Sequence, residues 1–257
     1  MSVLRSRDNP RLRRWQKLAR DARARKAEKR ALIEGPHLLA ALLNRGLSPV
    51  EVLVSESALA DGEIASLVAR AGRQPSVLSD SLFRAVADAR TPQGVAAEIA
   101  IPQGSGNPPR QVFLEGIQDA GNVGAILRSA AAFGIGRVVL DAACADPWSP
   151  KVLRAGMGGH FALAIEEGAD LDAEAAAFSG AVLCTASRGG TPLDQADLSG
   201  RVAWIFGNEG RGVSDRLQAL ATARVTIALA PGAESLNVAA AAAICLCAGF
   251  SKPGAGS

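Results

Sequence analysis

"WIFGNEGRGVSD", residues Trp204 to Asp215, decides how the second half of the chain is expected to fold. An apolar run typical of a buried strand leads directly into a loop with three glycines, one carboxamide and one carboxylate. Glycines at the end of a strand let backbone amides and carbonyls come close to a ligand. The loop lacks the Gly-Lys-Ser/Thr that a phosphate-binding P-loop needs. It is therefore expected to hold a neutral or cationic group, unless it is only a tight turn.

The rest of the chain alternates between strand and helix patterns in two blocks. A basic amphipathic helix is expected over residues 9–31, opened by Asn9 with Pro10 at its first position. Between residues 31 and 101 strand and helix patterns alternate, which describes a compact α/β unit. The segment 102–110, "PQGSGNPPR", has the composition of a linker. The expected parts are residues 1–101 with the leader helix, the linker, a second α/β domain over 111–250, and a disordered tail over 251–257.

Two more stretches of the second block carry polar residues at helix starts. In "DAGNVGAILRSAAAFGIG" Asn122 stands where a helix begins, and Arg128 follows on its second turn. Arg128 either faces an anionic ligand or is an ordinary surface arginine. In "IALAPGAESLNVAAAA" a strand ends in a Pro-Gly turn, and Ser235 is the expected N-cap of the last helix. Asn237 then falls in the first helical turn, where asparagine is a poor helix former.

Composition excludes several classes of protein. The chain has 257 residues, of which 48% are apolar, so a folded globular protein is expected. No apolar run is long enough to span a bilayer, and no secretory h-region follows the basic start; a transit peptide is disfavoured because the helical pattern runs on into the domain. The four cysteines lack zinc-site spacing and only two histidines accompany them, so no metal is expected. The cysteines are expected to be buried thiols in a reducing cytoplasm.

The charge is concentrated at the start of the chain. Residues 1–30 hold twelve Lys or Arg and three Asp or Glu, which leaves a mildly acidic remainder. Such a leader suits a polyanionic partner, and each phosphate contact would add about 0.9 to the salt slope on a B-form duplex. A solvated helical face explains the composition equally well. The residues proposed for RNA binding are Arg11, Arg13, Arg14 and Lys17.

Taken together, in this order and spacing, the three stretches resemble the signature motifs of the SpoU (TrmH-type) family of RNA ribose 2′-O-methyltransferases. The resemblance covers residues 111–250, and "SPKVLRAGMGG", Ser149 to Gly159, is similar to a fourth family segment. Two departures concern the serine that the family usually has where Gly156 stands, and the Ile-Pro-Met that becomes Ile-Ala-Leu from Ile227. The first block resembles the L7Ae/L30e-like substrate-binding domain often attached to this family, on "IEGPHLLAALL" and "RTPQGVAAEIA".

The resemblance implies a SPOUT-type α/β domain with a parallel sheet and a trefoil knot, S-adenosylmethionine as methyl donor, structured RNA as substrate and a homodimer. Ribosomal RNA is favoured over tRNA as the substrate, because the resemblance of the first domain points to family members that act on ribosomal RNA. The cofactor's positive sulfonium explains why the glycine loop needs no lysine. The residues implied for cofactor binding are Thr185, Ala186, Gly207, Asn208, Gly210, Ile227, Leu229 and Leu236. The implied catalytic residues are Arg128, Asn122, Glu209, Ser235 and Asn237.

The chemistry needs an aligned ribose, a proton acceptor and stabilisation of the developing alkoxide. Family accounts often make the motif arginine, here Arg128, the base, but removing a proton from arginine at neutral pH is costly. A charged Arg128 that grips the adjacent phosphate is expected instead, with Glu209 as proton acceptor or as orienter of Arg128. Asn122, Ser235 and Asn237 would align ribose and cofactor. His160 is a less favoured base.

Two other functions stay open at this point. An RNA-binding or assembly protein that keeps the fold without catalysis is one alternative, although such a protein would not need all three motifs. A SPOUT enzyme that methylates a base nitrogen is the other, although "SLNV" with the Asn122–Arg128 pair favours ribose. Few aromatic residues and no tyrosine favour recognition of RNA by shape and phosphate over base stacking.

Overall fold

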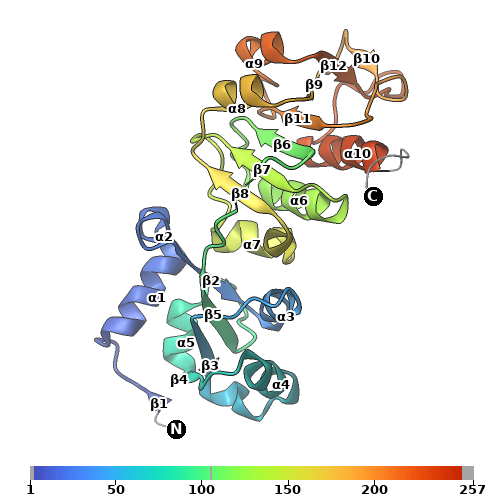
Figure 1. Cartoon of the computed structure of the whole chain (residues 1–257). Coiled ribbons are helices and arrows are strands. Elements are labelled where there is room, and N and C mark those ends of the chain that lie inside the picture. Colours follow the sequence, from blue (N-terminus) through green and yellow to red (C-terminus); the bar gives the residue numbers. More distant parts are fainter. Residues whose placement is uncertain (1–2, 105, 251–257) are drawn as a thin grey trace. The chain divides into compact units, whose positions relative to one another are not determined.

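The computed structural model describes residues 3–104 and 106–250, and these form two compact units (Figure 1). The first unit contains the chain up to Pro102 together with Trp148–Phe161, and the second contains the remainder. The division after Pro102 falls where the linker composition begins. The excursion Trp148–Phe161 packs with the first unit, although its place in the sequence lies inside the second block. The prediction of a disordered tail concerns residues 251–257, which lie outside the described residues.

A mixed five-stranded sheet forms the centre of the first unit, in the order β1-β4-β3-β5-β2. The strand β5 runs antiparallel to β2 and β3, whereas β4 is parallel to β3 and β1. The strands are β1 Val3–Leu4, β2 Arg30–Glu34, β3 Glu51–Ser55, β4 Ser76–Leu78 and β5 Val95–Ala100. The helices that follow them are α3 Pro36–Asn44, the 3₁₀ helix Glu56–Ala60, α4 Gly62–Ala71 and α5 Asp80–Val86.

The basic leader forms two helices, α1 Pro10–Arg20 and α2 Ala22–Glu28, so the prediction of a single helix over 9–31 is wrong. The break lies at Asp21, whose backbone is extended and whose carboxylate accepts a hydrogen bond from the Arg23 amide as the cap of α2. The predicted start is confirmed, because Asn9 caps α1 and Pro10 occupies its first turn. The apolar face of α1 is buried in the first unit's core.

Glu98 on β5 anchors this leader. Its side chain is fully buried and accepts two hydrogen bonds from Arg14, at 2.7 and 2.8 Å, and one from the Trp15 indole at 3.3 Å. A buried carboxylate is tolerated when such donors satisfy it, and removal of a partner is costly. Part of the positive charge of α1 therefore docks the helix on the sheet.

The excursion joins the first unit through the helix α7 Pro150–Gly156. Arg154 forms an ion pair with Asp88 at 2.7 Å. The buried His160 ring packs 5.3 Å from the Trp148 ring, measured between centroids. The structure thus gives His160 a packing role in the first unit.

The second unit contains a seven-stranded sheet in the order β10-β12-β9-β11-β6-β7-β8, and every pairing is parallel. The predicted parallel sheet is confirmed. The strands are β6 Arg110–Leu114, β7 Arg137–Leu140, β8 Ala164–Glu167, β9 Ala181–Thr185, β10 Thr191–Pro192, β11 Val202–Phe206 and β12 Ala223–Thr226. The chain runs outward from β6 to β8 and returns to place β11 on the other side of β6. Ligands bind beyond the carboxyl ends of parallel strands near such reversals.

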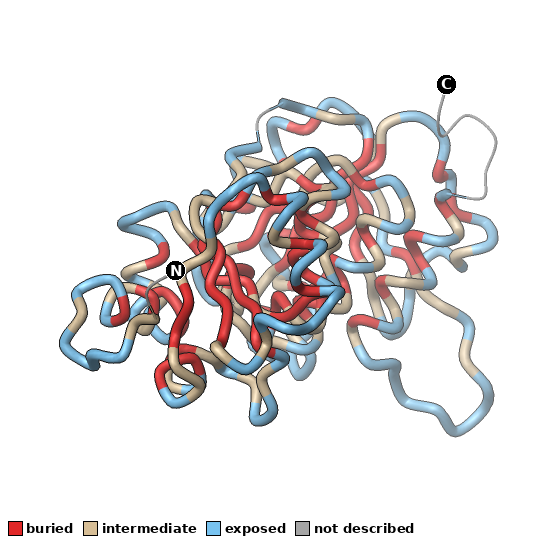
Figure 2. Tube along the Cα trace, turned by 90° about the horizontal axis from the view of Figure 1, so that it is seen from below, coloured by how far each residue is buried: buried red, intermediate tan, exposed pale blue. Residues whose placement is uncertain are grey.

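Helices cover this sheet, and its central strands β6, β7 and β11 are buried, whereas the edge strands β8 and β10 are not. Buried segments of the chain are red in Figure 2. They are α6 Ala120–Ala132, α8 Leu171–Ala177, α9 Asp215–Leu220 and α10 Val238–Phe250. α10 packs against α6 and begins later than expected, so the predicted Ser235 cap is wrong. The Asn237 carboxamide oxygen accepts hydrogen bonds from the amides of Ala239 and Ala240, at 2.9 and 3.3 Å. Asn237 is thus a helix cap, which removes the difficulty of placing it inside the helix.

The cysteines form no disulfide, and they differ in burial. Cys184 and Cys245 are buried and Cys144 is half-buried, but Cys247 is exposed, so the prediction of four buried thiols is wrong for Cys247. Burial raises the pKa of both Cys144 and Cys245 to about 12. Within residues 3–104 and 106–250 there is no metal-binding group of His, Cys, Asp and Glu side chains. The helices described there include none that could cross a membrane.

Candidate active site

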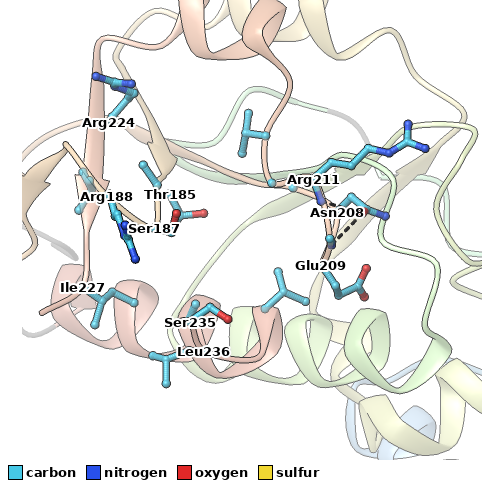
Figure 3. A pocket seen from close by; sticks show the side chains of 18 of the residues that line it. Thr185, Ser187, Arg188, Asn208, Glu209, Arg211, Arg224, Ile227, Ser235 and Leu236 are labelled. Atoms are coloured by element: carbon cyan, nitrogen blue, oxygen red, sulfur yellow. Dashed lines mark hydrogen bonds between the residues drawn. The ribbon is translucent and has the colours of Figure 1, made fainter. Parts of the chain in front are cut away.

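A cavity of about 530 Å³ opens at the carboxyl ends of β9, β11 and β12, between the glycine loop after β11 and the segment before α10 (Figure 3). This volume suits a small-molecule ligand. The lining includes all the residues predicted for cofactor binding, namely Thr185, Ala186, Gly207, Asn208, Gly210, Ile227, Leu229 and Leu236. The topology brings them together because parallel strands end at the same edge of the sheet.

The glycine loop after β11 is closed on itself by hydrogen bonds around Asn208. The Gly212 amide donates to the Asn208 carbonyl at 2.8 Å, and the Gly210 amide donates to the Asn208 side-chain oxygen at 2.9 Å. The Asn208 side-chain nitrogen donates to the Gly116 carbonyl at 2.9 Å, which fixes the loop to the end of β6. A Cβ atom at Gly207 would overlap the backbone of Gly212 and Val213. Gly207 is therefore required by this close backbone approach.

Three side chains connect the three motifs. The Asn237 carboxamide donates to the Asn122 carboxamide oxygen at 2.9 Å, and the Asn122 nitrogen donates to a Glu209 carboxylate oxygen at 2.9 Å. Asn122 stands in the first turn of α6, where its amide is capped by Asp119 at 2.8 Å. Both asparagines are held by helix starts, so they orient the exposed Glu209 carboxylate at the wall of the cavity.

The predicted catalytic residues occupy different positions relative to the cavity. Glu209 and Ser235 line it, whereas Asn122 and Asn237 reach it only through Glu209. Arg128 is exposed on α6, and no hydrogen bond or ion pair is recorded for its side chain within the described part of the chain. It follows Asn122 by six residues, or about 9 Å along the helix. Three of the five residues thus form one hydrogen-bonded series, Ser235 lines the same cavity as Glu209, and Arg128 lies outside both.

The predicted RNA-binding residues of α1 differ in how they contact the protein. Arg11 contacts Ser76 at 2.5 Å and pairs with Glu51, and Arg14 is held by Glu98. A second group on the same helix is more open to solvent. Arg13 forms an ion pair with the exposed Asp8, and Lys17 is exposed.

Sequence reasoning missed several polar residues of the cavity. Arg188 lines it from the loop after β9, Arg224 from β12, and Gln218 from α9. Outside the lining, the Glu115 carboxylate just after β6 accepts a hydrogen bond from the Ser214 amide at 2.7 Å. The one available signal was position, and only for Arg188, which directly follows the predicted strand over residues 181–187; Glu115 falls inside the predicted strand over residues 111–117.

The lining fits S-adenosylmethionine by the chemistry of its donors and walls. Ile227, Leu229 and Leu236 provide an apolar wall for a purine. Glu209 and Glu234 bring carboxylates to the wall of the cavity, Arg188, Arg211 and Arg224 bring guanidinium groups, and no lysine is among the lining residues of the described chain. The lining therefore offers carboxylates to a sulfonium and guanidinium groups to the carboxylate of an amino-acid moiety.

Comparison with known proteins identifies both parts of the chain. Residues 109–247 match the SpoU rRNA methylase family model, and residues 9–97 match the MRM3-like substrate binding domain. The 23S rRNA (guanosine(2553)-2′-O)-methyltransferase RlmP of Bacillus subtilis is 33% identical over 251 residues, covering 95% of this chain and 97% of the relative.

Solved structures agree with this assignment. The AdoMet-bound rRNA methyltransferase from Sinorhizobium meliloti is 25% identical with a TM-score of 0.81, covering 96% of this chain and 97% of that one. A TrmH-family RNA methyltransferase structure from Porphyromonas gingivalis is 28% identical with a TM-score of 0.81, covering 96% and 98%. The second and third motifs line one cavity, and Asn122 of the first motif is hydrogen-bonded to Glu209 at its wall. The chain belongs to the SpoU rRNA methylase family.

Proposed function

We propose that the protein transfers a methyl group from S-adenosylmethionine to a ribose 2′-hydroxyl of RNA, and that the RNA is ribosomal. The hydrogen-bonded series Asn237–Asn122–Glu209 carries the proposal, because it places an oriented carboxylate at the mouth of a cavity that suits the cofactor. The names of the RlmP relative and of the MRM3-like domain support ribosomal RNA over tRNA.

Each side chain has a distinct part in this mechanism. The cofactor supplies a methyl group activated on a cationic sulfur. Glu209 accepts the proton of the 2′-hydroxyl, held in place by Asn122 and, through it, by Asn237. Arg128, which is charged and has no recorded side-chain partner among the described residues, grips the neighbouring RNA phosphate and favours the developing alkoxide. Ser235 lines the cavity and orients the cofactor or the ribose.

The leader contributes RNA affinity through its solvent-exposed positively charged side chains. Lys17 and Arg13 are the residues we assign to phosphate contacts, while Arg14 docks the helix through Glu98 and Arg11 is held by Glu51 and Ser76. The reaction is assigned to the cytoplasm, where thiols such as those of this chain stay reduced. The trefoil knot remains part of the proposed fold.

The proposed activity is tested with purified protein, radiolabelled S-adenosylmethionine and total RNA from cells that lack the gene. We expect label in one ribosomal RNA, at one linkage that resists alkali, because a 2′-O-methyl group blocks the attack of the neighbouring hydroxyl. Label at an alkali-sensitive linkage would indicate methylation of a base. Cofactor binding with no transfer to RNA or to intact ribosomal subunits would favour a catalytically silent RNA-binding protein.

We also propose that the protein is a homodimer through α10. The helix contains no charged residue and is apolar on all sides, which is typical of a helix buried on all sides. One side packs on α6, yet Ile244 remains 40% exposed, and Cys247 lies one turn further along that exposed side. A second copy of the same apolar stripe is the occupant that a two-fold interface would supply.

Replacing Ile244 by glutamate is expected to convert the dimer to a monomer, because two charges would be buried against each other. The mass in solution, measured by light scattering, would fall by half. Labelling of Cys247 by a thiol reagent should speed up in the variant, while Cys245, buried and with its pKa raised to about 12, stays slow. A wild-type monomer with a rapidly labelled Cys247 would contradict the proposed interface.

A further inference from the structure

The loop between β9 and β10 presents Arg188 to the cavity from a fixed backbone. The Ala186 amide donates to the Val225 carbonyl at 2.9 Å, and the Gly190 amide donates to the Thr226 hydroxyl at 3.0 Å. Arg224 adds a hydrogen bond to the Gly189 carbonyl at 3.3 Å. The loop is thus attached to β12 on both sides of Arg188.

Glycine is needed where the loop meets β12. A Cβ atom at Gly190 would lie 2.7 Å from the Thr226 hydroxyl and 2.8 Å from the Arg224 carbonyl oxygen, which is too close for any other residue without a shift. Gly189 has a φ of +73°, in the left-handed region. These two glycines let the chain turn sharply, so the side chain just before them is aimed by the backbone.

The Arg188 side chain itself is exposed and extends into the cavity. It ends in the part of the cavity where Ile227 and Leu236 form the apolar wall, while Glu209 lies at the opposite side (Figure 3). No hydrogen bond or ion pair holds this guanidinium among the described residues. The Arg188 guanidinium and the apolar wall therefore enclose a slot, of which one face is cationic and the other is apolar.

A purine fits a slot of this kind. Its flat ring needs an apolar surface below, and a guanidinium plane stacks well on an aromatic face. The methyl donor must direct its sulfur toward Glu209, where the ribose hydroxyl is activated, so its purine is left for the Ile227 side. We propose, on the basis of the function proposed above, that Arg188 stacks on the adenine of the cofactor and closes the cavity over it.

The test measures, by calorimetry, the affinity of the wild type and of each variant for two ligands. S-Adenosylhomocysteine contains both the purine and an amino-acid carboxylate, whereas 5′-methylthioadenosine keeps the purine, the ribose and a thioether but has no carboxylate. Arg188→Ala is expected to weaken both ligands by the same factor, about five- to thirtyfold. Arg188→Lys keeps the charge but loses the plane, so it should recover little. Arg216→Ala is the charge control, because Arg216 pairs with Asp172 at 2.8 Å outside the cavity.

Other outcomes would overturn the assignment. A loss confined to S-adenosylhomocysteine and restored by Arg188→Lys would show a contact with the carboxylate. Unchanged affinity for both ligands with a raised KM for RNA would show a phosphate contact. In each case wild type still binds S-adenosylhomocysteine, so the proposed function stands. Absence of wild-type binding to either ligand would instead count against the proposed function.

Discussion

Arg128→Ala is expected to lower kcat for methyl transfer by about 10²- to 10³-fold while the affinity for S-adenosylhomocysteine stays within about twofold of wild type. The size follows from the loss of a bidentate, charge-assisted contact to the RNA phosphate next to the developing alkoxide. The cofactor affinity is spared because Arg128 does not line the cavity. The measurement is single-turnover transfer to RNA, with binding of the product cofactor measured separately.

Arg128→Lys separates charge from geometry in the same assay. Lysine keeps the positive charge but cannot form a bidentate contact with phosphate, so an intermediate rate is expected. If Arg128→Ala kept near wild-type methylation while Glu209→Ala abolished it, the assignment of charge stabilisation to Arg128 would be wrong. Glu209 alone would then carry the catalytic contribution of this side of the site.

The parallel sheet and the cavity lining were predicted from the family resemblance that the motifs carry, and the local strand and loop patterns agree with both. A strand pattern that runs into "GNEGRG" predicts a loop at the edge of a sheet, and parallel strands gather such loops at one edge. For this reason Thr185, the last residue of β9, meets Gly207 and Ile227, which directly follow β11 and β12, in one cavity.

The hydrogen bonds between the motifs could not be predicted from the periodicity of the sequence. Asn122 and Glu209 are 87 positions apart, and Asn122 and Asn237 are 115 apart, so no helical or strand period relates them. The start of α10 depends on which residue caps the helix, and the sequence alone does not identify that residue. Ser235 and Asn237 are both good caps, and the choice between them depends on where the chain leaves the cavity.

The same limits apply to the first unit. Periodicity runs unbroken through Asp21, yet its carboxylate caps a new helix and ends the old one. The helical pattern of α7 predicts one buried face, but it does not predict which of the two cores buries that face. In the structure α7 packs with the first unit. Arg188 was missed because an exposed arginine in a loop has no pattern, and only the attachment of that loop to β12 gives it a direction.

Gly207→Ala is expected to weaken S-adenosylhomocysteine binding by about ten- to a hundredfold, as a result of backbone overlap alone. The added Cβ atom would meet the backbone of Gly212 and Val213, which cannot rotate away as a side chain can. Overpacking of this kind costs about 1–3 kcal/mol, and each 1.4 kcal/mol is tenfold in affinity. Relief requires the loop to open, which displaces Asn208 and with it Glu209, so methylation should fall further than binding.

Gly210→Ala provides the matched control in the same loop. Its Cβ atom would lie 3.5 Å from the Asn208 side-chain oxygen, an ordinary contact, and its amide hydrogen bond to that oxygen would persist. Binding of this variant should stay within about threefold of wild type. Calorimetry measures S-adenosylhomocysteine binding by both variants, and thermal unfolding measures their stability. Equal losses at Gly207 and Gly210 would mean that the loop responds to any added methyl group, and that the approach of Gly207 to Gly212 does not fix its shape.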